Sequence, residues 1–427
     1  NLHRVVIRRD GAERAGAVLP YTLGDSADPE DLWAYMARYQ QQTGGRVLAI
    51  PHNGNLSNGM MFADLTLAGE TYDSDYLRRR QQWEPLVEVT QIKGDGETHP
   101  LLSPEDEFAD YETWDAGNLD FSQAKTDDML RYEYAREALK RGLDYQARHG
   151  FNPFEFGLIG SSDSHTSLAA VEEDNFFGKT SSKEPGPKRA QGYFNKTDQG
   201  AIYNWQQVSS GYAAVWAREN TREALWDAMS RREVYGTTGS RITVRMFGGW
   251  GFTLADSHAP DLAAVGYAKG VPMGAELGAP AGTGSPSFLV AAQRDPIGAN
   301  LDRIQIVKGW RASDDGQLRE KVYDVAWSGE RKPGADGRLP PLGSTVDVAG
   351  ASWTNTVGAP QLVTVWRDPA FDPGQAAFYY VRVLEIPTPR WTAYDASRLG
   401  VKMPEGAAMT TRERAYTSPI WYKPPNT

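Results

Sequence analysis

The chain has 427 residues, and its composition and charge exclude several classes of protein. Apolar residues make up 40%, with 13 Trp, 20 Tyr and 14 Phe, which excludes a disordered, collagen-like or coiled-coil chain. The net charge of −10 argues against nucleic-acid binding through a globally basic surface. The absence of cysteine excludes disulfides, zinc–thiolate sites and thiol nucleophiles, and no apolar run reaches the ~18 to 20 residues of a membrane span.

The first part of the chain alternates strand and helix signals. Asp28 followed by Pro29 is typical of a helix start, and this helix is predicted to end at Gly44. Further helices are predicted over 126–149 and 224–232. Strands are predicted over 3–9, 46–50, 85–89, 156–162 and 212–217. This order of elements implies a parallel sheet or an α/β barrel.

The pattern changes near Ser240, after which no convincing helix signal appears and alternating apolar and polar residues dominate. The sequence therefore predicts an α/β region over 1–240 and an antiparallel, β-rich region over 241–427 that packs on it. The segment 175–204 has little apolar periodicity and carries several lysines. We expect a long surface excursion there that covers the candidate site.

Polar residues that can bind metals lie at or near the ends of the predicted strands. His52 follows strand 46–50, Glu88 lies within strand 85–89, and Asp163 and His165 follow strand 156–162. In a (β/α) barrel such side chains converge on one face. Imidazole and carboxylate ligands without thiolate suit Mn, Fe or Zn, and a carboxylate inside an apolar strand favours a cationic partner.

Structural explanations compete with this interpretation. Asp256-Ser257-His258 repeats the Asp-x-His pattern in a loop without a buried strand before it, and we assign it to structure or solvent. His149 ends a predicted helix, where a partly positive imidazole is favourable with the dipole. The serines beside His165 lack a GxSxG nucleophile elbow. Tryptophans of the β region could form a carbohydrate platform, but sheet alternation favours core packing.

Several long strings resemble the DUF3604 family, which is related to the PHP (polymerase and histidinol phosphatase) metallohydrolases. The resemblance spans nearly the whole chain. It rests on AIPHNGNLSNG (49–59), PLVEVTQIKGDGETHPLLSPEDEFADYE (85–112), FGLIGSSDSHTS (156–167), AVWARENTREALWDAMSRREVYGTTGSRI (214–242), GYAKGVPMG (266–274) and YTSPIWY (416–422).

The resemblance implies a distorted PHP-like, TIM-barrel-like (β/α)7 barrel with an appended antiparallel β-rich region. It also implies two or three divalent ions (Mn, Fe or Zn) and hydrolysis of phosphate or related esters. The residues that match the family's metal positions are His52, Glu88, Asp163 and His165, and His3 and His99 lie in family-like strings.

The PHP pattern opens with His-x-His on its first strand, and that segment has no counterpart in this sequence. The chain resembles the later two-thirds of such a protein, and we expect the opening strands on a separate N-terminal segment that acts as a partner. Family members are often exported, so the resemblance implies a periplasmic or secreted location.

The sequence predicts a metal-dependent hydrolase, phosphoesterase-like, in which a metal-activated water attacks a small-molecule ester. Asp163, His165 and Glu88 are the expected catalytic residues. The expected substrate-binding residues are Asn53, Asn55, Lys93 and Arg218. The alternative is a non-catalytic ligand-binding or accessory protein with a degenerate metal site.

Overall fold

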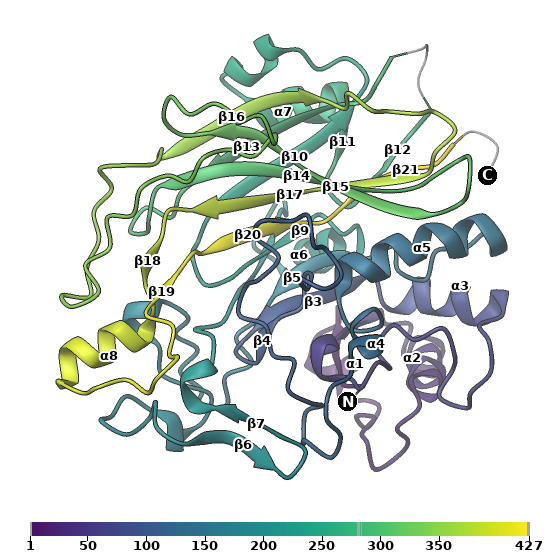
Figure 1. Ribbon diagram of the computed structural model, residues 1–427. Coiled ribbons are helices and arrows are strands. Elements are labelled where there is room, and N and C mark those ends of the chain that lie inside the picture. The colour runs from purple at the N-terminus through teal and green to yellow at the C-terminus, as the bar shows by residue number, and fades with distance from the viewer. Residues whose placement is uncertain (1, 280–281, 283, 425–427) are drawn as a thin grey trace.

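The computed structural model describes residues 2–279, 282 and 284–424, and in this part the chain forms six sheets. Two are large, with eight and four strands, and they lie together at one side of the molecule (Figure 1). None of the six closes on itself, so the predicted (β/α)7 barrel is wrong. Strands that were expected to be neighbours in one barrel are divided among separate sheets: β1 pairs with β2, β3 with β5, and β8 with β9, whose other neighbour is β20 from the far end of the chain.

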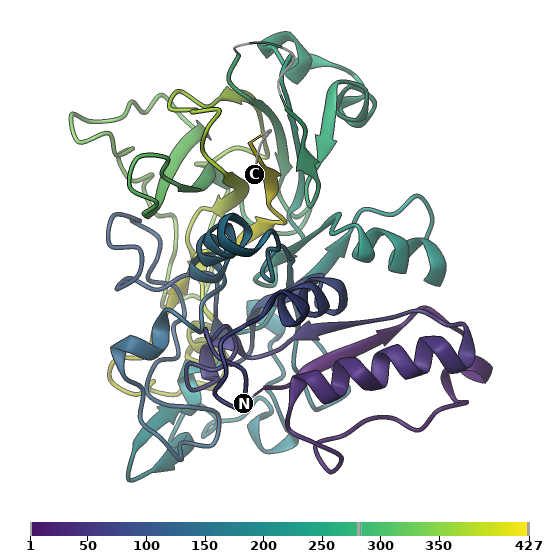
Figure 2. The same ribbon diagram turned by 90° about the vertical axis from the view of Figure 1, so that its right-hand side faces the viewer.

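The helices lie mainly at the N-terminal side, and α2 covers one face of the β1–β2 pair (Figure 2). In the described residues they are α1 (Ala12–Ala15), α2 (Pro29–Thr43), α3 (Ser74–Trp83), α4 (Asp127–Leu130), α5 (Ala135–His149), α6 (Arg222–Ser230), α7 (Leu262–Lys269) and α8 (Trp391–Leu399). The predicted ends of α2 are confirmed: Asp28 accepts a hydrogen bond from the Glu30 amide, and Gly44 adopts the left-handed conformation.

Two helix predictions are wrong. The single helix expected over 126–149 is broken between α4 and α5, because the Tyr132 carbonyl accepts a hydrogen bond from the Phe62 amide and not from its own helix. Helices α7 and α8 occur after residue 240, where none was expected. Asp261 starts α7 by accepting a hydrogen bond from the Ala264 amide, a local helix-start signal that sequence reasoning missed.

The eight-stranded sheet joins both halves of the sequence. Its strands are β8 (Tyr212–Val215), β9 (Val234–Thr237), β12 (Glu276–Leu277), β14 (Leu301–Arg311), β15 (Leu318–Trp327), β17 (Ala377–Glu385), β20 (Arg414–Thr417) and β21 (Ile420–Tyr422). Strand β20 pairs antiparallel with β9, with Ala415 opposite Thr237, and also with β17. The sheet thus crosses the boundary expected at residue 240, and the division into regions 1–240 and 241–427 stays a prediction.

The remaining sheets are smaller. The four-stranded antiparallel sheet has the order β11 (Gly270–Pro272), β10 (Thr243–Gly249), β13 (Ser287–Gln293) and β16 (Gln361–Arg367). The others are β1 (Arg4–Arg8) with β2 (Val47–Pro51); β4 (Gly94–Asp95), β3 (Leu86–Gln91) and β5 (Gly157–Gly160); β6 (Tyr193–Thr197) with β7 (Gly200–Tyr203); and β18 (Thr388–Pro389) with β19 (Thr410–Thr411). Strands β3 and β5 are parallel.

Glycines let β5 and β9 approach closely at the point where β5 ends. A Cβ on Gly236 would lie 2.6 Å from the amide nitrogen of Gly160, and a Cβ on Gly160 would lie 2.6 Å from the Thr237 carbonyl oxygen. Both distances are shorter than any tolerated carbon contact, so only glycine fits on either side. This contact fixes the position from which the chain continues into Ser161 and Asp163.

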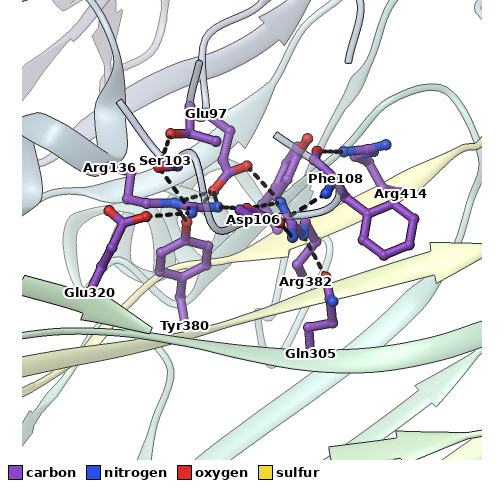
Figure 3. A network of polar contacts seen from close by, with 12 residues as sticks. Glu97, Ser103, Asp106, Phe108, Arg136, Gln305, Glu320, Tyr380, Arg382 and Arg414 are labelled. Atoms are coloured by element: carbon purple, nitrogen blue, oxygen red, sulfur yellow. Dashed lines mark hydrogen bonds and ion pairs between the residues drawn. The ribbon is translucent and has the colours of Figure 1, made fainter. Parts of the chain in front are cut away.

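A buried polar network attaches the eight-stranded sheet to the loop that follows β4 (Figure 3). Arg382 of β17 donates two hydrogen bonds to Asp106, of 2.6 and 2.9 Å, and contacts Glu97 at 3.3 Å. Arg136 of α5 reaches the same two carboxylates and also Glu320 of β15. Tyr380 donates to Glu97. Two cations and three carboxylates from distant parts of the chain are therefore mutually compensated in the interior.

In the described part of the chain, no helix combines the length and apolar character needed to cross a membrane.

Removal of one member of the buried network is expected to cost much of the stability. Arg382→Met deletes a fully buried cation and leaves Asp106 and Glu97 partly uncompensated, so the free energy of unfolding should fall by about 3–5 kcal/mol. Urea denaturation measures the change. The control is Arg148→Met, which removes a half-exposed partner of Asp144 and should leave the midpoint nearly unchanged. Equal effects of the two substitutions would contradict the structural role of the network.

Asp95 is expected to make stability depend on pH. It is buried and accepts hydrogen bonds from the Tyr416 hydroxyl and the Glu97 amide. Burial and the nearby Glu97 carboxylate raise its pKa to about 7, above the usual 3.8. The folded state therefore binds the proton of the Asp95 carboxyl group more tightly than the unfolded state does. This difference stabilises the fold below pH 4, and the stabilisation is lost as the pH rises through 7.

The side chain at position 95 of the Asp95→Asn variant cannot ionise. Between pH 4 and 8, the free energy of unfolding of this variant should therefore fall by about 2–4 kcal/mol less than that of the unmodified protein. Urea unfolding at a series of pH values tests this, with the exposed Asp110→Asn as control. An unchanged pH profile for Asp95→Asn would show that Asp95 is ionised in the folded protein throughout this range.

Candidate functional site

Three strand ends bring the predicted site residues together even without a barrel. His52 follows β2, Glu88 lies in β3, and Asp163 and His165 follow β5. The Nε2 atoms of His52 and His165 lie 3.6 and 3.3 Å from the same oxygen, Oδ1 of Asp163. Two imidazoles therefore converge on one carboxylate.

Glu88 contacts the opposite side of the His52 ring. His52 Nδ1 lies 2.7 Å from Glu88 Oε2, and Ser161 Oγ donates to the same oxygen at 2.5 Å. The Asn53 amide donates to the other oxygen at 3.4 Å. A carboxylate on Nδ1 fixes the proton there and leaves Nε2 as the free donor atom, directed at Asp163. This geometry gives Glu88 the role of orienting His52.

The backbone at the site is strained at two positions. Asp163 and Asn53 have φ angles of 49° and 57°, in the left-handed region that non-glycine residues rarely adopt. The Asp163 conformation is held from outside the loop: Lys179 donates from Nζ to the Asp163 carbonyl at 2.8 Å, and the His165 amide donates to the Lys179 carbonyl at 2.7 Å. Such strain is typical of functional sites.

Two lysines approach the second carboxylate oxygen of Asp163. Lys93, which is only 3% exposed, contacts Oδ2, and Lys179 Nζ lies 2.7 Å from the same atom. Burial and the nearby Lys179 lower the pKa of Lys93 to about 6, and burial lowers the pKa of Lys179 to about 8. Lys179, together with burial, lowers the pKa of His165. An anionic ligand beside these two amines would favour their protonated, cationic forms.

The donor atoms suit a divalent ion in type and spacing. Two ligands of a tetrahedral ion with bonds of ~2.1 Å are ~3.4 Å apart, close to the two separations between the imidazoles and Asp163. Beside them, the buried Oδ1 of Asn53 has no hydrogen-bond partner. The described residues contain no group of three or more His, Asp or Glu side chains already placed to hold a metal ion. Lys179 Nζ also lies 3.2 Å from His165 Nε2. An ion bound here requires that ammonium to move.

The other predicted site residues lie in different surroundings. The His3 ring stacks on His52 with centroids 6.4 Å apart, so His3 flanks the cluster. His99 contacts Asp115 and packs against Tyr134. Asn55 donates to the Lys93 carbonyl and so positions the lysine backbone. Arg218 is exposed beyond β8 and forms no ion pair within the described part of the chain.

Sequence reasoning missed two members of this cluster. Ser161 holds Glu88, and Lys179 reaches Asp163 from the 175–204 segment, which was expected to cover the candidate site but from which no lysine was named as a site residue. The signal that could have found Lys179 is the position of that segment directly after an Asp-x-His motif.

Comparison with known proteins gives one match. No curated protein and no solved structure matches the chain. The link to the PHP metallohydrolases stays a prediction. A family model described as "Protein of unknown function (DUF3604)" matches residues 1–424. The chain therefore belongs to the DUF3604 family.

Proposed function

We propose that the protein is a metal-dependent hydrolase of small anionic esters, of which phosphate esters are the first candidates. The observation that carries the proposal is the convergence of His52 and His165 on Asp163 next to two buried lysines. Imidazole and carboxylate donors suit Mn, Fe or Zn. Lys179, whose pKa stays near 8, supplies positive charge for a substrate that carries negative charge, and the bound anion would favour protonation of Lys93 as well.

A divalent ion held by His52, Asp163 and His165 would supply Lewis acidity toward the ester oxygens and a nucleophilic water of lowered pKa. Glu88 keeps the His52 ring in the orientation that presents Nε2. Lys93 and Lys179 bind the anionic group and offset the charge that develops on it. The left-handed turn at Asp163 sets its two carboxylate oxygens toward different partners, with the imidazoles on one and the lysines on the other.

Asp163→Ala removes the carboxylate that both imidazoles and both lysines share. We expect loss of bound metal and at least a ~100-fold fall in kcat/KM, with the fold retained. Elemental analysis and hydrolysis of p-nitrophenyl phosphate and bis-p-nitrophenyl phosphate measure the two effects. The matched control is Asp256→Ala, which alters the second Asp-x-His tripeptide, where Asp256 caps a short helical turn and pairs with Lys269 at 2.6 Å. Full activity in Asp163→Ala would refute the proposal.

Glu88→Gln tests the orienting role separately. The amide keeps the shape of the side chain but weakens the contact with His52 Nδ1, so metal affinity should fall about 10- to 100-fold. Competition with a chelator measures the affinity, and excess metal should restore most of the activity. If metal content is lost completely and excess metal does not restore it, Glu88 is itself a ligand and not a positioning residue.

A further inference from the structure

A second cavity, of about 490 Å³, lies away from the candidate site and shares none of its residues. It is bounded by residues 108–114 of the loop after β4, by the short turn η4 (Asn204–Gln206), and by residues 408–414 around β19. Two arginines, Arg412 and Arg414, line it together with several aromatic side chains. The volume lies within the ~300 to 1,000 Å³ that is usual for small-molecule sites.

Arg414 of β20 is a buried cation without a carboxylate partner. It is 3% exposed and forms no ion pair within residues 2–279, 282 and 284–424. Its Nη1 donates to the Phe108 carbonyl at 3.0 Å (Figure 3), and its Nε donates to the Arg412 carbonyl at 3.4 Å. The guanidinium lies over the Tyr111 ring, 3.7 Å from the centroid. These contacts hold the group in place, but the hydrogen bonds use only two of its five N–H groups.

The charge of Arg414 is not neutralised by its surroundings. Arginine stays protonated in proteins, whereas a buried carboxyl group can become neutral by taking up a proton. Burial raises the pKa of Asp95 to about 7 although the charge of Arg414 lowers it, and the two form no ion pair among the described residues. Of the carboxylates in the lining, Glu112 forms a two-point contact with Arg390, and Asp110 is exposed. An uncompensated buried charge is costly, and an anionic ligand would lower that cost.

Arg412 adds a second positive charge to the cavity. It donates to Asp302 at 2.9 Å, but the same carboxylate also pairs with Arg303 and Arg331. Burial and the nearby charges of Arg303 and Arg414 lower the pKa of Arg412, although Asp302 opposes this effect. Arg412 is therefore only partly compensated, and it can share an anion with Arg414.

A buried hydroxyl group gives an independent indication of a ligand. Thr411 lines the cavity and is 7% exposed. In the part of the chain that the structure describes, its Oγ1 atom has no hydrogen-bond partner. Buried polar groups of folded proteins nearly always have one. An oxyanion bound beside the arginines would offer this hydroxyl an acceptor.

The aromatic side chains indicate that the ligand carries a flat apolar group. Trp205 of η4 lines the cavity and is only partly buried. Its ring lies beside that of Tyr203, with centroids 6.0 Å apart, and within the described chain no cation lies over it. Indole rings bury large apolar areas and prefer aromatic partners. The cavity is also many times larger than the ~30 Å³ share of one water in the liquid, so it suits an organic molecule better than a simple inorganic anion.

We propose that this cavity binds a small aromatic carboxylate, whose carboxylate group accepts hydrogen bonds from Arg412 and Arg414 and whose ring packs against Trp205. The guanidinium fork matches the two oxygens of a carboxylate in spacing and charge.

Isothermal titration of the full chain with cinnamate tests the proposal. We expect saturable binding at one site per chain, and at least tenfold weaker binding of the neutral cinnamamide. Arg412→Gln and Arg414→Gln should each weaken cinnamate binding about tenfold or more, because each removes charge-assisted hydrogen bonds to the carboxylate. The matched control is Arg331→Gln. It also removes a cation from Asp302, but Arg331 does not line the cavity, so binding should stay unchanged.

The lysines of the candidate site could also attract this anion. Lys179→Met separates the two sites, since it removes a cation beside Asp163 and leaves the cavity intact. Absence of saturable cinnamate binding, equal binding of cinnamamide, or binding that neither glutamine variant weakens would each overturn the proposal. Thermal unfolding by circular dichroism checks that each variant is folded. If the buried Arg414→Gln variant is not, Arg412→Gln decides the test, because the Arg412 side chain is 20% exposed.

Discussion

The structure depends on one interior electrostatic arrangement, in which Arg382 and Arg136 compensate Glu97, Asp106 and Glu320. Arg382 comes from the centre of the eight-stranded sheet, and the acidic residues Glu97 and Asp106 come from the loop after β4. Apolar packing could hold these layers together in several registers. Bidentate contacts between guanidinium and carboxylate groups are directional, so they select one of them.

The geometry of the candidate site depends on this contact between the eight-stranded sheet and the loop after β4. Strand β17 carries Arg382 and also pairs with β20, which in turn pairs with β9. Gly236 of β9 then lies against Gly160, where β5 ends and the chain turns into the Asp163 loop. A chain of rigid contacts thus connects the buried network to the position of the Asp163 carboxylate. The two lysines meet that carboxylate from separate segments, which places cations and anions at short distances without a closed barrel.

Sequence reasoning predicted local features such as helix ends, but it did not predict which strands pair with one another. Caps such as Asp28 and Gly44 depend on a few neighbouring residues, and the helix ends that they predict are present. The residues of the β2, β3 and β5 strand ends were also found, because a polar residue after or within an apolar strand is visible in one dimension. The prediction of a closed barrel was wrong because β9 pairs with β20, which lies almost 180 residues further along the chain. No local sequence pattern indicates a partner at that separation. Lys179 was missed for the same reason, since its contact with Asp163 depends on how a loop returns.

The pairing of β9 with β20 also sets an order of events during synthesis. Residues 160–165 and 236 are made early, but the strand that supports β9 on its second side spans Arg414–Thr417. Contacts of such sequence separation form slowly and only after the intervening chain exists. While the ribosome is still adding the β-rich region, the edge of β9 is open, and Glu97 and Asp106 have Arg136 as a partner but lack Arg382. Until Arg382 is made, the carboxylates of Glu97 and Asp106 therefore have one of their two cationic partners, and β9 presents an unpaired strand edge.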